Sequence, residues 1–101
     1  MDTAQLVKDI KARFNINYQK EQLREKYNAK LILADQGGLW KATTELLGFL
    51  ASNTDEYVII QDSYDNPIFV NRVTLHDKLD KVYSDTMNQW YTELKKLENN
   101  R

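Results

Sequence analysis

Apolar residues recur at helical spacing along the last quarter of the chain. Leu75 and Leu79 open this pattern, and a second row follows at a strict 4-3-4-3 spacing, made of Tyr83, Met87, Trp90, Leu94 and Leu97. Such a period predicts one long amphipathic helix over residues 74–101, with charged side chains on its opposite face. Thr74 stands three residues before Asp77, a spacing typical of a capping box, so we expect the helix to begin there.

The N-terminal third shows the same period in two shorter pieces. Leu6 and Ile10 share one side of a helix expected over residues 3–14. Residues 14–18 then alternate apolar and asparagine side chains, which predicts a short extended break. Helical spacing resumes over residues 19–27.

The middle of the chain indicates two hairpins separated by a helix. Residues 30–34 are a strand candidate, residues 35–38 a turn with two glycines, and residues 39–42 either pair back or run into the next helix. That helix is expected over Thr44–Ser52, with Thr43 as its N-cap.

The second hairpin gives the clearest strand signal. Tyr57–Gln61 and residues 68–70 are apolar runs on either side of a polar turn, residues 62–67. Both faces of the first run are apolar, which predicts a central strand or one covered on both sides. The whole pattern predicts a single α+β domain, residues 1–101. It has N-terminal helices, a small antiparallel sheet from two hairpins with an intervening helix, and a long C-terminal amphipathic helix over one face.

Composition narrows the class of protein. The 101 residues are 42% hydrophobic and 29% charged, which is typical of an ordinary globular domain. No apolar run is long enough to cross a membrane, and the first residues lack the profile of a signal peptide. Cysteine is absent. We therefore expect a cytoplasmic protein with no membrane partner.

Charge is unevenly distributed although the net charge is −1. Residues 1–34 carry seven basic and four acidic side chains, whereas residues 35–67 carry one basic and six acidic ones. The basic third also contains tyrosines, so one hypothesis is binding of single-stranded nucleic acid through Arg13, Lys20, Arg24, Lys26 and Lys30. Because acidic residues alternate with these basic ones, a solvated helix face is the preferred interpretation.

Few residues could form a catalytic or metal site. His76 is the only histidine, and neither a second histidine nor a cysteine accompanies it, so we expect a solvated helix residue. Asp62, Asp65 and Asn66 look like the start of a calcium loop, but the glycine and the distant glutamate of that motif are missing. These residues are better explained as a turn that bonds its own backbone.

The two glycines before Trp40 could bring backbone amides to a phosphate. A phosphate loop would continue with lysine and serine or threonine, and Leu39 and Trp40 follow instead, so a tight turn is favoured. We expect Trp40 to lie in the core rather than on the surface. Taken together, the residues predict no enzyme, no cofactor and no metal site.

The length of the last helix raises the question of what covers it. From Leu75 to Glu98 it would span about 36 Å, whereas strands of three to five residues are only about 10–17 Å long. The last two or three turns of the helix must therefore overhang the sheet, pack on the N-terminal helices or contact another chain. The candidate interface is the row Tyr83, Met87, Trp90, Leu94 and Leu97.

Three stretches resemble a known group of proteins. They are residues 27–43, residues 62–72, and the later helix segment Met87-Asn88-Gln89-Trp90-Tyr91. Together they resemble small proteins, without an established activity, of tailed phages from marine environments, including phages of cyanobacteria. The resemblance implies a viral protein in the cytoplasm of a bacterial host and transfers no functional residue.

These observations favour a non-enzymatic phage accessory or assembly protein that acts through a helical interface. Its partner would be itself, in a homo-oligomer, or another protein. The alternative is a nucleic-acid-binding accessory protein that uses the basic N-terminal third.

Overall fold

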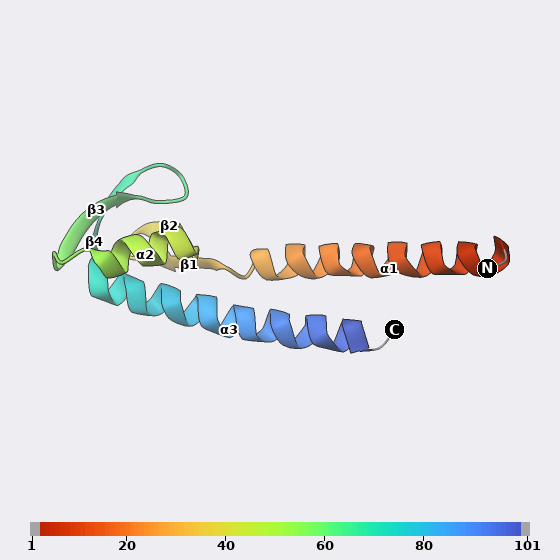
Figure 1. The fold of residues 1–101 in the computed structure, drawn as a ribbon. Coiled ribbons are helices and arrows are strands. Elements are labelled where there is room, and N and C mark those ends of the chain that lie inside the picture. Colours follow the sequence, from red (N-terminus) through yellow and green to blue (C-terminus); the bar gives the residue numbers. More distant parts are fainter. Residues whose placement is uncertain (1–2, 100–101) are drawn as a thin grey trace.

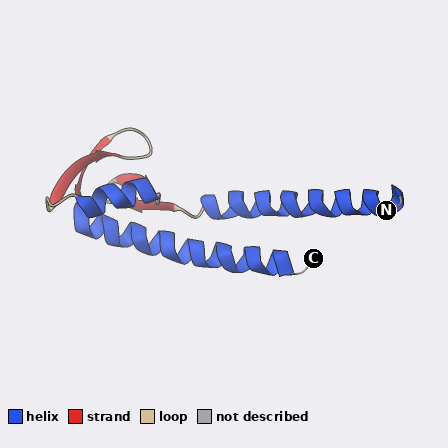
Figure 2. Ribbon diagram, viewed as in Figure 1, coloured by secondary structure: helices blue, strands red, loops and turns tan. Residues whose placement is uncertain are grey.

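The computed structural model describes residues 3–99 and confirms the α+β class (Figures 1 and 2). Asn100 and Arg101, the last two residues of the predicted C-terminal helix, lie outside the described range. The elements in chain order are α1 (Thr3–Asn28), β1 (Ile32–Asp35), β2 (Gly38–Lys41), α2 (Thr44–Ser52), β3 (Tyr57–Gln61), β4 (Pro67–Asn71) and α3 (Arg72–Asn99).

The N-terminal third is one continuous helix, and the predicted break at residues 14–18 is wrong. Helix α1 runs for 26 residues without interruption. The alternating apolar and asparagine residues suggested an extended chain, but no glycine or proline lies between residues 3 and 28 to stop a helix.

Each hairpin forms its own two-stranded sheet, rather than the single sheet that we predicted. Strand β1 pairs with β2 and β3 pairs with β4, both antiparallel. The β1–β2 turn has Gln36 at φ 51° and Gly37 at φ 82°, the two positive angles that a two-residue hairpin loop requires. The expected tight turn is thereby confirmed.

Side chains join the two sheets where a backbone ladder is absent. Asn71 donates its backbone N–H to Gln36 Oε1 at 2.7 Å, and Gln36 Nε2 donates back to the Asn71 carbonyl oxygen at 3.3 Å. Asp62 Oδ2 accepts the backbone N–H of Leu39 at 3.1 Å, while Ser63 donates its N–H to the Leu39 carbonyl at 2.8 Å. Polar contacts thus replace strand pairing between the hairpins.

The two helices that follow strands have identifiable caps. Thr43 Oγ1 accepts the backbone N–H of Leu46 at 3.1 Å, which confirms the predicted start of α2. Helix α3 begins at Arg72, two residues earlier than predicted, because Asn71 Oδ1 accepts the backbone N–H of Thr74 at 3.0 Å. The cap of α3 is therefore Asn71, and Thr74 lies inside the first turn.

The core lies where both hairpins and α2 meet the first half of α3. Trp40 is 1% exposed, which confirms its core position, and its indole Nε1 donates to the carbonyl oxygen of Asp35 at 2.9 Å. Its buried neighbours are Leu31, Ala42, Leu50, Val58, Val70, Leu75 and Leu79.

Strand β3 is covered on one side only, so the predicted double coverage is wrong. Val58 is buried and Ile60 is half-buried, whereas Tyr57 and Ile59 are exposed. A two-stranded sheet has one face on the core and leaves the other in water.

The molecule is elongated, because α1 and α3 extend away from this core (Figure 1). Its principal extents are 65 × 23 × 19 Å and its radius of gyration is 19.4 Å. A compact domain of this length has a radius of gyration of about 13 Å. Much of the helical surface therefore lies outside the core.

Candidate interaction surfaces

The C-terminal half of α1 packs antiparallel to the C-terminal half of α3. The Tyr27 and Trp90 rings stack with centroids 6.0 Å apart and an interplanar angle of 11°. Lys26 Nζ lies 2.8 Å from Glu93 Oε1, and Lys20 Nζ lies 3.9 Å from Glu98 Oε1. These contacts place the end of α3 level with about residue 20 of α1.

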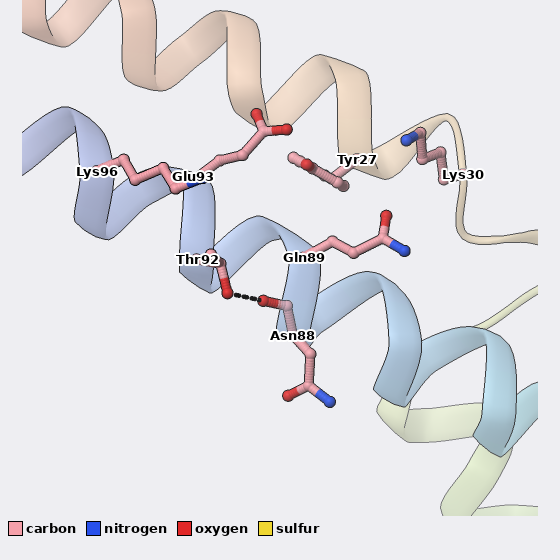
Figure 3. A pocket seen from close by; sticks show the side chains of 7 residues that line it. All are labelled: Tyr27, Lys30, Asn88, Gln89, Thr92, Glu93 and Lys96. Atoms are coloured by element: carbon pink, nitrogen blue, oxygen red, sulfur yellow. Dashed lines mark hydrogen bonds between the residues drawn. The ribbon is translucent and has the colours of Figure 1, made fainter.

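The ion pair between α1 and α3 shifts the pKa values of three ionisable groups. The hydrogen bond between Lys26 and Glu93 raises the pKa of the lysine and lowers the pKa of the carboxylate. The same carboxylate raises the pKa of the Tyr27 phenol. Figure 3 shows Tyr27 and Glu93 in an open groove that is also lined by Lys30, Asn88, Gln89, Thr92 and Lys96.

The predicted interface row on α3 divides between two environments. Tyr83 and Met87 pack against the core cluster, Trp90 stacks on Tyr27, and Leu97 lies in a groove with Leu23. On the other flank a shallow, almost wholly apolar groove faces water, lined by Met87, Trp90, Tyr91 and Leu94. Part of the row is thus used within the chain.

The predicted nucleic-acid residues do not form a free basic surface. Lys20 and Lys26 face Glu98 and Glu93, and Arg24 lies 3.0 Å from Glu21. Lys30 Nζ lies over the Tyr27 ring, 5.0 Å from its centroid. Arg13 is exposed on the N-terminal half of α1. Most of this positive charge is balanced locally by acidic side chains, and no further observation favours nucleic-acid binding.

The first part of α1 projects beyond the end of α3 (Figure 1). We call residues 3–18 the arm, a helical segment about 24 Å long. The arm contains no buried residue, and its large apolar side chains are exposed, Phe14 to 70%. They are Leu6, Val7, Ile10, Phe14 and Tyr18. Their periodicity predicted an amphipathic helix from the sequence, but it did not predict what would cover the apolar side.

A second exposed apolar surface lies on the β3–β4 hairpin. The Tyr57 and Phe69 rings stack with centroids 5.1 Å apart. Ile59 is paired with Phe69 across the strands and is 68% exposed. We call Tyr57, Ile59 and Phe69 the outer face of the hairpin. The sequence did not single out these residues, because an apolar strand face resembles core.

The polar residues considered as ligand sites have local structural roles. Asp62 Oδ1 accepts the backbone N–H groups of Tyr64 and Asn66 at 3.0 and 3.1 Å, which confirms the turn interpretation. The backbone amide of Leu39, followed by those of the turn, holds the pKa of Asp62 below its usual range. His76 Nδ1 lies 3.1 Å from Asp77 Oδ1. Within residues 3–99, no three histidine or acidic side chains gather into a possible metal site.

Comparison with protein-family models, curated proteins and solved structures finds no match to this chain. Among the helices of residues 3–99, none combines the length and apolar character needed to span a membrane.

Proposed function

We propose that this protein is a non-enzymatic interaction protein that self-associates through the arm. The single observation that carries the proposal is an apolar row, exposed on the part of α1 that extends past the end of α3. The resemblance to marine phage proteins supplies the proposed setting, an accessory or assembly factor in an infected bacterial cell.

The arm needs a contact that the single chain does not supply. Short helices without packing are marginal in water, and the arm has no buried residue and is joined to the packed half of α1 only at its C-terminal end. A covering surface would stabilise the helix and remove its apolar side chains from water.

The exposed area fits a small dimer interface. The five apolar side chains are 43–70% exposed, which leaves on the order of 500 Å² of apolar surface on one arm. Two arms facing each other would bury about 1,000 Å², the lower limit for a specific contact.

The order of the side chains along the arm favours a second copy as the occupant. Leu6, Ile10, Phe14 and Tyr18 are spaced every four residues. In an antiparallel pair, Leu6 lies opposite Tyr18 and Ile10 opposite Phe14, each pair twice, as a two-fold axis requires. Rows of this spacing pack with the helices crossing at about 50°.

Helix α3 leaves this arrangement unobstructed. The residues of α1 that contact α3 include Lys20, Leu23 and Tyr27. At about 100° per residue, the centre of the arm's apolar row lies roughly 120° around the helix from them. Two arms can therefore meet without displacing either α3.

Sedimentation equilibrium tests self-association. We expect a wild-type dimer and a monomeric double variant Ile10→Ser/Phe14→Ser, because four buried side chains per dimer are lost, worth about 6 kcal/mol. The matched control is Lys8→Ser/Asn15→Ser, two exposed positions on the polar side of the arm, which should remain dimeric. A wild type that stays monomeric at high concentration, or a control that dissociates equally, would contradict the proposal.

Disulfide cross-linking tests the relative orientation of the two arms. Because the sequence contains no cysteine, only the introduced cysteines can form a disulfide. A mixture of Leu6→Cys and Tyr18→Cys chains should form a disulfide-linked dimer. Leu6→Cys alone should not, since its two sulfurs would be about 18 Å apart along the arms. The reverse result would indicate parallel arms.

A further inference from the structure

The outer edge of β3 is an open strand edge. Asp62 donates its N–H to the Asn66 carbonyl at 3.0 Å, and Arg72 donates its N–H to the Glu56 carbonyl at 2.9 Å. In an antiparallel ladder the bonded pairs alternate, so even-numbered residues of β3 face β4. The N–H and C=O groups of residues 57, 59 and 61 therefore point away from the sheet.

The opposite edge of this sheet, on β4, is blocked at both of its ends. Pro67 has no N–H to offer, and both backbone groups of Asn71 are bonded to the Gln36 side chain. On β3, by contrast, the structure of residues 3–99 gives no hydrogen bond to the outward backbone groups of Tyr57 or Ile59. The fold thus blocks both ends of the β4 edge against strand pairing and leaves the β3 edge available along its length.

The open edge borders an apolar face. Tyr57 and Ile59 alternate with the buried Val58, and Phe69 lies beside them on β4. An added strand would continue this face, and its alternate side chains would contact Tyr57 and Ile59.

Charge decides which strand fits. Residues 35–67 carry six acidic side chains against one lysine, and Asp55 and Glu56 directly precede β3. Antiparallel pairing of two copies around Ile59 would set Glu56 opposite Asp62 of the second copy, twice, which is unfavourable. A strand with basic flanks would meet complementary charge instead.

We propose that the outer edge of β3 binds an extended segment of another protein by strand addition, a segment with alternating apolar residues and basic flanks. This surface is independent of the arm, which lies at the other end of the molecule (Figure 1). Failure of one proposal leaves the other standing.

The test uses a fluorescent synthetic peptide, Lys-Lys-Val-Thr-Val-Thr-Val-Lys-Lys, with binding followed by fluorescence anisotropy. We expect binding to the full chain, with slower amide hydrogen exchange at residues 57, 59 and 61. Ile59→Pro removes an outward N–H but no ladder hydrogen bond, so it should weaken binding by about tenfold or more. Ile59→Thr retains that N–H and should bind within about threefold of wild type.

A second experiment does not depend on the folding of a variant. The same peptide carrying N-methyl groups on the amides that would face β3 keeps its charge but loses its backbone donors. Equal binding of this peptide would mean that charge alone attracts it, and would overturn the proposal. The absence of binding at millimolar peptide concentration would also overturn the proposal. So would slow hydrogen exchange of the amides of residues 57, 59 and 61 in the absence of peptide, because it would indicate self-association at this edge.

Discussion

Gly38→Ala tests the packing that holds the first hairpin against the core. A Cβ atom at position 38 would lie 2.7 Å from Trp40 Cζ2 and 2.9 Å from Cε2. Carbon atoms in contact are normally about 3.5–4.0 Å apart, so the indole would have to move by about 0.8 Å. Trp40 has no room for this, since it is 1% exposed and its Nε1 is bonded to the Asp35 carbonyl.

The expected cost follows from these contacts. Overpacking of a core costs about 1–3 kcal/mol, and weakening the indole hydrogen bond adds about 1 kcal/mol. The reduced freedom of the unfolded chain offsets about 0.4–1 kcal/mol. Gly38 is not in the left-handed region, so no conformational strain is added. We expect Gly38→Ala to lower the free energy of unfolding by about 2 kcal/mol.

Gly48 provides the matched control for the same chemical change. It lies inside α2, and a Cβ there would meet nothing within 4 Å. Gly48→Ala should therefore stabilise the protein by about 0.5–1 kcal/mol through helix propensity. Urea titration followed by circular dichroism and tryptophan fluorescence measures both variants. An equal or higher midpoint for Gly38→Ala than for wild type would refute the reasoning.

The other predictions concern the cap, one carboxylate and the core. Asn71→Ala should destabilise the protein by about 1 kcal/mol in urea titration, while Thr74→Ala should change little, because Asn71 is the cap of α3. The backbone amides of Leu39 and of the turn lower the pKa of Asp62 in the folded protein. The stability that this carboxylate contributes is therefore present above about pH 4, and it is lost as the pH falls through the lowered pKa of the folded state. The difference in urea midpoint between wild type and Asp62→Asn should narrow over that acid range. Leu79→Ala should cost about 3 kcal/mol, whereas alanine at the leucine of the arm should cost under about 0.5 kcal/mol in dilute monomer.

Sequence periodicity predicted most elements, and its errors have physical causes. Thr43 and the Tyr57–Gln61 strand were found because local signals mark them: a cap hydroxyl and an apolar run. The start of α3 was misplaced because Asn71 and Thr74 are both good caps. Only the position where β4 ends decides between them.

Features that depend on distant residues could not be predicted. Gln36 reaches Asn71, 35 residues away, and this side-chain contact joins two separate sheets where we predicted a single one. Likewise, periodicity shows that Ile10 and Phe14 share a helical side, but not whether anything covers it. An exposed apolar row and a buried one have the same spacing, so the exposure of the arm could not be predicted.

The pairing of the first helix with the last has a consequence for the order of folding. Lys26 and Glu93 are 67 residues apart in sequence, whereas each hairpin closes through a turn of a few residues. Closing the longer loop costs more chain entropy, and the contact that it forms buries fewer side chains. We therefore expect the hairpins, α2 and the start of α3 to form the nucleus. Helix α1 then docks late, so that weakening the Tyr27–Trp90 stack accelerates unfolding more than it slows folding.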